Sequence, residues 1–133
     1  MIVLKKIRKI ENYSQKNIIF ASLKDLMLME IMFEKVALEE LYTHENTQDR
    51  EYNRLPKDIV KRYVKVVNYM KAVKRVEDLF LINSLHYEKL KGNLKEVEAV
   101  RLNKQYRLLF QSLPDESGIM VTALIFDISK HYE

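Results

Sequence analysis

Two arginines in the last third of the chain have the type and spacing of a phosphate site. Arg101 and Arg107 flank the turn sequence Asn103-Lys104, and strand alternation would point both side chains to the same face of neighbouring strands. A loop of three residues would place them directly opposite each other, where like charges are unfavourable unless an anion lies between them. Guanidinium groups match phosphate geometry, so the pair predicts a phosphate site. Alternatively, each arginine is solvated or pairs with a nearby carboxylate, such as that of Glu98, Asp115 or Asp127.

Two further residues could add proton transfer and positive charge to this site. An imidazole is the side chain that titrates nearest neutrality, which makes His131 the best acid or base candidate, although a histidine near a C-terminus is often merely solvated. Lys91 precedes Gly92, so a flexible turn could bring its ammonium to the same face, while a solvated lysine is the alternative. The chain has no cysteine, no phosphate-binding glycine loop and no zinc-ligand spacing, and nothing in it indicates a cofactor or a metal.

The elements that must position these residues follow from the hydrophobic pattern. Residues 31–33 are predicted to form a strand and residues 36–42 a short helix, followed by a polar loop over 43–53. Pro56 lies near a helix start, and the apolar residues from Ile59 to Val73 recur at the spacing of one buried helix face. A further helix is expected over 75–81. Residues 97–102, 106–111 and 119–128 read as three consecutive antiparallel strands, which the strand at 31–33 could join. The prediction is an α+β fold, a small antiparallel sheet with two or three helices packed on one face.

Length and charge bound the remaining possibilities. A chain of 133 residues is the size of one domain, and no apolar run is long enough for a membrane span, so a cytoplasmic protein is expected. Residues 1–28 hold six Lys/Arg and two Asp/Glu, and they are interpreted either as an extension or as an integral element ahead of a domain over 29–133. Beyond them the charges balance, but they are separated: residues 57–75 are strongly basic and residues 30–51 acidic. A positive face of this kind can meet RNA or an acidic partner.

Three blocks of the last third resemble a known family. Tyr87-Glu88-Lys89-Leu90-Lys91-Gly92-Asn93, the stretch from Val100 to Phe110, and Ile128-Ser129-Lys130-His131-Tyr132 are similar in sequence, order and interval to HigB-type toxins of the RelE superfamily. Residues 30–86 fit more loosely through their strand–helix–helix pattern, and residues 1–28 are not covered.

The resemblance implies a toxin of a type II toxin–antitoxin pair that cuts messenger RNA on the translating ribosome. Cleavage without a metal needs a base for the 2′-hydroxyl, cations for the phosphorane and an acid for the 5′-oxygen. The catalytic residues expected are Lys91, Arg101, Arg107 and His131. Lys89, Lys104 and Lys130 are candidates for holding the RNA backbone, and Tyr132 for stacking on a base, although a tyrosine packed on the sheet is equally compatible. The implied partners are mRNA on the ribosome and an antitoxin, often with a helix-turn-helix.

The chain departs from the family pattern at two places, and two other functions compete. Many HigB-type members end in Asp-Tyr-His where this chain has Lys130-His131-Tyr132, so the carboxylate that would orient His131 is open, with Asp127 as one candidate. Glu88 stands where the family has a histidine before Leu-Lys-Gly. A ParE-like toxin of the same fold would inhibit DNA gyrase by binding and would not need His131. A non-catalytic module would bind nucleic acid or antitoxin through the basic face.

Overall fold

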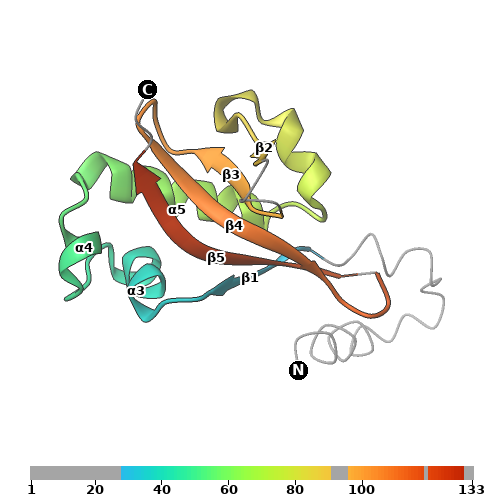
Figure 1. Cartoon of the computed structure of the whole chain (residues 1–133), viewed down its shortest axis with the longest axis horizontal. Helices are drawn as coiled ribbons and strands as arrows, with labels where there is room; N and C mark the ends of the chain where they lie inside the picture. Colours follow the sequence, from blue (N-terminus) through green and yellow to red (C-terminus); the bar gives the residue numbers. More distant parts are fainter. Residues whose placement is uncertain (1–27, 91–95, 119, 131–133) are drawn as a thin grey trace, which may run out of the picture.

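The computed structural model describes residues 28–90, 96–118 and 120–130 of the chain. Its described elements are one strand, then a run of helices, and then strands only (Figure 1). In chain order they are β1 (Glu30–Phe33), α3 (Val36–His44), α4 (Arg50–Asn53), α5 (Lys57–Lys71), the 3-10 helices η1 (Val76–Leu81) and η2 (Asn83–Leu85), β2 (Glu88–Lys89), β3 (Glu98–Arg101), β4 (Tyr106–Pro114) and β5 (Val121–Lys130).

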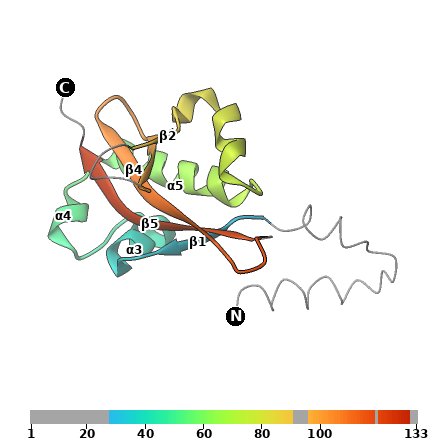
Figure 2. The same ribbon diagram turned by 45° about the vertical axis from the view of Figure 1, so that its right-hand side comes forward.

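The five strands form one sheet in the order β1-β5-β4-β3-β2. The three consecutive strands β3, β4 and β5 pair antiparallel, as the sequence predicts. The strand near residue 32 does join the sheet, but it runs parallel to β5, so the sheet is mixed rather than wholly antiparallel. Figure 2 shows β1 lying along β5 at this edge of the sheet. Two parallel strands need a long crossover connection. Here the chain from α3 to β4 lies between β1 and β5 and provides that connection.

The helices cover one face of the sheet, which confirms the predicted α+β class. Ile59, Tyr63, Val66, Val67 and Met70 of α5 are buried, at the three-to-four spacing read from the sequence. They belong to one core cluster with the alternate strand residues Val100, Leu108, Phe110, Ala123, Ile125 and Ile128. Each fully buried side chain of this size contributes roughly 1.5–3 kcal/mol to stability. The other strand residues, Arg101 and Arg107 among them, therefore point to the opposite face.

Two expectations for the middle of the chain needed correction. The polar loop over 43–53 contains the short helix α4, because the Asp49 carboxylate accepts hydrogen bonds from the backbone N–H groups of Glu51 and Tyr52 and caps it. The helix expected over 75–81 is the 3-10 helix η1, and the Asn83-Ser84 loop is a second 3-10 turn.

Strand β2 was not predicted. It has two residues, which pair with Ala99 and Glu98 of β3 and form the sheet edge opposite β1. Among the described helices, none combines the length and apolar character needed to cross a membrane.

Candidate active site

The arginine pair has the geometry that was expected for a three-residue loop. Arg101 of β3 is the direct partner of Arg107 of β4, and the Leu102 N–H bonds the Tyr106 carbonyl at 2.9 Å, which leaves a three-residue loop. The Asn103 side chain shapes this loop: its Oδ1 accepts hydrogen bonds from the Gln105 and Tyr106 N–H groups, both at 2.7 Å. The turn thus sets the register that brings two guanidinium groups to the same level of one sheet face.

The carboxylate that contacts this pair is Glu88 of β2. Its Oε1 lies 2.9 Å from Nη1 of Arg107, whose side chain is 18% exposed. Within the described residues, Arg101 makes no ion pair, so the site carries two cations against one contacting anion. This surplus of positive charge, held on a partly buried face, suits an anionic ligand.

Two carboxylates considered as alternative arginine partners are engaged elsewhere. Glu98 is buried, with Oε1 accepting from the Tyr87 hydroxyl at 2.5 Å and Oε2 from the Ser112 N–H at 2.7 Å. Burial and the Glu98 carboxylate raise the pKa of the Tyr87 phenol. Because Ser112 lies beyond the β3 pairing, the Glu98 side chain extends the hydrogen bonding of the ladder and ties Tyr87, just ahead of β2, to the sheet.

Asp127 of β5 is bound by a tyrosine that the sequence analysis did not single out. The hydroxyl of buried Tyr52 donates to Asp127 Oδ1 at 2.7 Å and accepts from Lys35 Nζ at 2.7 Å. Burial and the adjacent carboxylate raise the pKa of the Tyr52 phenol. The same Oδ1 also accepts from the Ile128 N–H at 2.9 Å, next to the β-bulge that shifts the β4–β5 register. Asp127 is therefore a structural anchor that holds β5 to α4, and one of its oxygens is already occupied.

The remaining predicted site residues fall into two groups. Lys89, Lys104 and Lys130 are described and exposed: Lys89 lies in β2, Lys104 in the turn between the arginines, and Lys130 at the end of β5, paired with Tyr106. The Lys130 ammonium lies 6.0 Å from the Tyr106 ring centroid. The other three, Lys91, His131 and Tyr132, lie outside the described residues.

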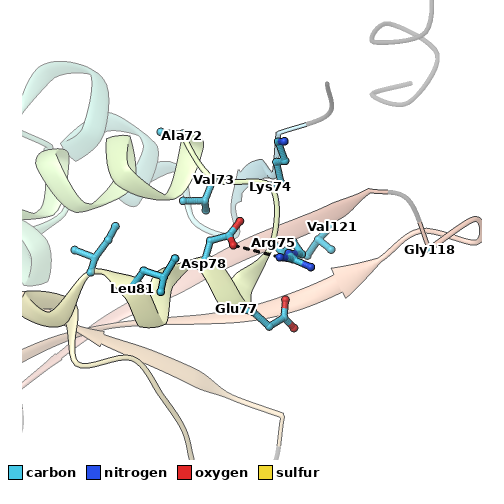
Figure 3. Close-up of a pocket in the computed structure, with 10 residues that line it drawn as sticks. Ala72, Val73, Lys74, Arg75, Glu77, Asp78, Leu81, Gly118 and Val121 are labelled. Atoms are coloured by element: carbon cyan, nitrogen blue, oxygen red, sulfur yellow. Dashed lines mark ion pairs between the residues drawn. The ribbon is translucent and has the colours of Figure 1, made fainter. Parts of the chain in front are cut away.

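One pocket of the described chain lies away from the arginine pair. A pocket of about 690 Å³ lies between the end of α5, η1 and the β4–β5 hairpin, lined by Lys74, Arg75, Asp78 and Leu81 among others (Figure 3). Arg75 is directed at Asp78 and pairs with it at 3.7 Å. Across the described ranges, no group of three or more His, Asp or Glu side chains is arranged to hold a metal ion.

Comparison with known proteins identifies the class and then the family. Among solved structures, the chain is similar to a YoeB/ParE toxin from Agrobacterium tumefaciens, with a TM-score of 0.50 and 12% identity over 78% of this chain and all of that one. A YoeB–YefM complex from Staphylococcus aureus matches at a TM-score of 0.45 and 21% identity, covering 80% of this chain and all of that one. The fold is thus that of the YoeB/ParE class of toxins.

The family follows from the sequence. Toxin HigB-1 of Vibrio cholerae is 31% identical over 83 residues, which are 62% of this chain and 83% of that protein. Residues 31–125 match the family model of RelE-like toxins of the HigB type II toxin–antitoxin system. The chain belongs to this family, which confirms the resemblance noted from its last third.

Proposed function

We propose that this toxin is a ribosome-dependent endoribonuclease that cuts mRNA and thereby inhibits translation. The observation that carries the proposal is the direct opposition of Arg101 and Arg107 on the open sheet face. Two facing guanidinium groups repel each other, and a bound phosphodiester turns that repulsion into two charge-assisted contacts. Membership of a type II toxin family supports the same reading and adds a cognate antitoxin as partner, which we propose to be a HigA-like helix-turn-helix protein.

In this proposal each of the four catalytic residues has one task. Arg101 and Arg107 hold the scissile phosphate, Lys91 adds positive charge in the transition state, and His131 protonates the 5′-oxygen as it leaves. Chain connectivity supports placing His131 here, because it follows Lys130, whose strand partner Tyr106 precedes Arg107. Lys91 is three residues after Glu88, a span of at most about 11 Å of extended chain, and Glu88 itself contacts Arg107.

The RNA backbone on either side of the cut needs positive charge rather than exact geometry. Lys104 and Lys130, at the same end of the sheet as the arginine pair, are proposed to supply it, with Lys89 on the neighbouring edge strand. Tyr132 is proposed to stack on a base. Because the substrate is a translated message, the proposed site of action is the cytoplasm.

The test is primer-extension mapping of a message during translation in a purified system, with and without ribosomes. Wild-type protein should produce discrete breaks that need ribosomes, and Arg101→Gln or Arg107→Gln should each lower the cleavage rate by about 10²-fold or more. His131→Ala should lower it by about 10²–10⁴-fold. Arg75→Gln is the matched control, since it removes an arginine in the remote pocket of Figure 3 and should leave cleavage unchanged.

The competing ParE-like function is examined with the same preparations. Inhibition of gyrase-catalysed supercoiling by wild-type protein, with no breaks in the translated message, would refute the nuclease proposal. Equal cleavage by wild type and the Arg101→Gln, Arg107→Gln double variant would remove the arginine pair from the mechanism.

A further inference from the structure

The pocket of Figure 3, which we call the η1 pocket, has a partly apolar lining that is open to solvent. Its apolar residues come from the end of α5, from η1 and from the start of β5: Ala72, Val73, Leu81, Ile82 and Val121. Leu81 is 81% exposed. A single exposed leucine needs no explanation, but here it lines a hollow of about 690 Å³, which is within the size range of binding pockets. The η1 pocket therefore suits an apolar occupant.

The chain enters the fold at the wall of this pocket. The Met29 N–H donates to the Val73 carbonyl at 2.8 Å, and the Met29 side chain is 3% exposed within the core. Val73 itself lines the η1 pocket. Residues 1–27, which precede the described part of the chain, are thus attached beside the pocket. They also precede the region matched by the family model, which begins at residue 31.

The sequence of this preceding segment contains an apolar run that could fill the pocket. Residues 17–23, Asn-Ile-Ile-Phe-Ala-Ser-Leu, carry no charge and include Ile18, Ile19, Phe20 and Leu23. Leu23 is six residues from Met29 and Ile18 eleven, spans of at most about 22 and 40 Å of extended chain. The run can therefore reach the pocket. A tether of this length also gives an effective concentration on the order of millimolar, so weak contacts are enough for docking.

The charges around the pocket fit an occupant with basic flanks. Arg75 pairs with Asp78 at 3.7 Å, whereas the neighbouring Glu77 is exposed and makes no ion pair within the described residues. The apolar run is flanked by Lys16 on one side and Lys24 on the other. A lysine next to the docked run could thus pair with Glu77, which gives the pocket a preference for this segment over an acidic one.

We propose that residues 18–23 of this same chain dock in the η1 pocket and cover Leu81. Their apolar side chains leave water together with those of Leu81 and Val121, which is the driving force for docking. The lining of the pocket does not include Arg101 or Arg107, so docking leaves the arginine pair open. This inference is independent of the proposed nuclease function.

The experiment traps the docked segment with a disulfide in the full chain. The protein has no cysteine, so a double variant contains one defined pair. Ser22→Cys lies within the apolar run, and Lys74→Cys lies at the pocket. The matched control pairs Ser22→Cys with Lys65→Cys, the same change at an exposed lysine of α5 that does not line the pocket. Under mild oxidation, followed by non-reducing electrophoresis and mass spectrometry, the pocket pair should close at least about 10-fold faster than the control pair, within single chains.

Two further changes separate docking from mere closeness along the chain. Phe20→Asp in the run, or Leu81→Asp in the pocket, should each slow closure of the pocket pair to the rate of the control pair, because a charge opposes apolar burial. Leu81 is exposed, so its replacement should leave the circular dichroism spectrum unchanged. Val36→Asp, at an apolar residue that is 73% exposed and does not line the pocket, should leave the rate of closure unchanged.

Three results would overturn the proposal. Equal closure rates for the pocket pair and the control pair would show that the segment does not occupy the pocket, which would then be left to a separate partner. Closure that persists in both Phe20→Asp and Leu81→Asp would show closeness along the chain without docking. Disulfide-linked dimers whose yield rises with protein concentration would assign the pocket to a second copy of the chain. All three are measured without mRNA or ribosomes, so they leave the nuclease proposal untouched.

Discussion

Replacing Tyr52 by phenylalanine removes one oxygen atom and tests the anchor between α4 and β5. The hydroxyl donates to a carboxylate, Asp127, and such charge-assisted bonds contribute about 1.5–3 kcal/mol. Its second partner, Lys35, is exposed and can turn to water, so that bond adds little. Asp127 keeps the Ile128 N–H. Tyr52→Phe should therefore lower the free energy of unfolding by about 2 kcal/mol, which corresponds to a fall of about 7 °C in Tm for a chain of this size.

Urea unfolding followed by circular dichroism measures this loss as a lower midpoint with an unchanged slope. Tyr42→Phe is the matched control: its hydroxyl bonds Asn68 at the surface, a neutral acceptor, and should cost about 0.5 kcal/mol or less. Adding Asp127→Asn completes a double-mutant cycle, in which a coupling of about 1 kcal/mol is expected between the two side chains. A Tyr52→Phe protein as stable as wild type, or additive effects in the cycle, would show that the bond to Asp127 does not anchor β5.

Three further predictions concern the tyrosines, the turn and the RNA backbone. Burial raises the pKa of Tyr63, and burial with Glu98 raises that of Tyr87, so both phenols stay protonated in the folded state when unfolded phenols ionise near about pH 10. The contribution of these phenols to the free energy of unfolding is fully present below that pH and should be lost as the pH rises above it. Tyr63→Phe should make this loss smaller, which is measured by comparing urea unfolding midpoints from about pH 9 to 11. Asn103→Ala removes the acceptor of two backbone N–H groups in the turn and should cost about 0.5–1.5 kcal/mol by urea unfolding; no change would mean that the turn holds without it. Lys104→Gln and Lys130→Gln should each reduce the slope of log affinity against log salt for ribosome-bound message by about 0.7–0.9, and an unaltered slope would remove that lysine from the RNA contact.

The parts of this fold that sequence could predict are those set by local pattern. The apolar repeat of α5 runs over fifteen residues, long enough to establish both the helix and its buried face. The register of the two arginines depended on the length of the loop, which the sequence left open, but the three consecutive strands and the Asn103-Lys104 turn were readable for the same reason as α5. These features depend on neighbours within a few residues, which a sequence displays directly.

What sequence could not predict depends on contacts between distant segments. Strand β2 has two residues, too few to show any period, so its pairing with β3 and the approach of Glu88 to Arg107 emerge only in the fold. The bond between Tyr52 and Asp127 joins residues 75 positions apart. The one available signal was that Glu88 stands at the position of a family histidine, which marks a residue of interest but not the arginine it contacts.

The alternation that builds the core also creates the arginine site. Leu108 and Phe110 must face the helices, which sends Arg107 to the other face, and a slip of one residue would bury that guanidinium in the core. The Asn103 turn then fixes Arg101 at the same level, so the unfavourable pairing of two like charges is forced by the packing of the sheet. Glu88 relieves part of this repulsion from the shortest strand, the one least tied to the core. The two cations therefore belong to strands that contribute to the core, whereas the carboxylate that contacts one of them belongs to the edge of the sheet.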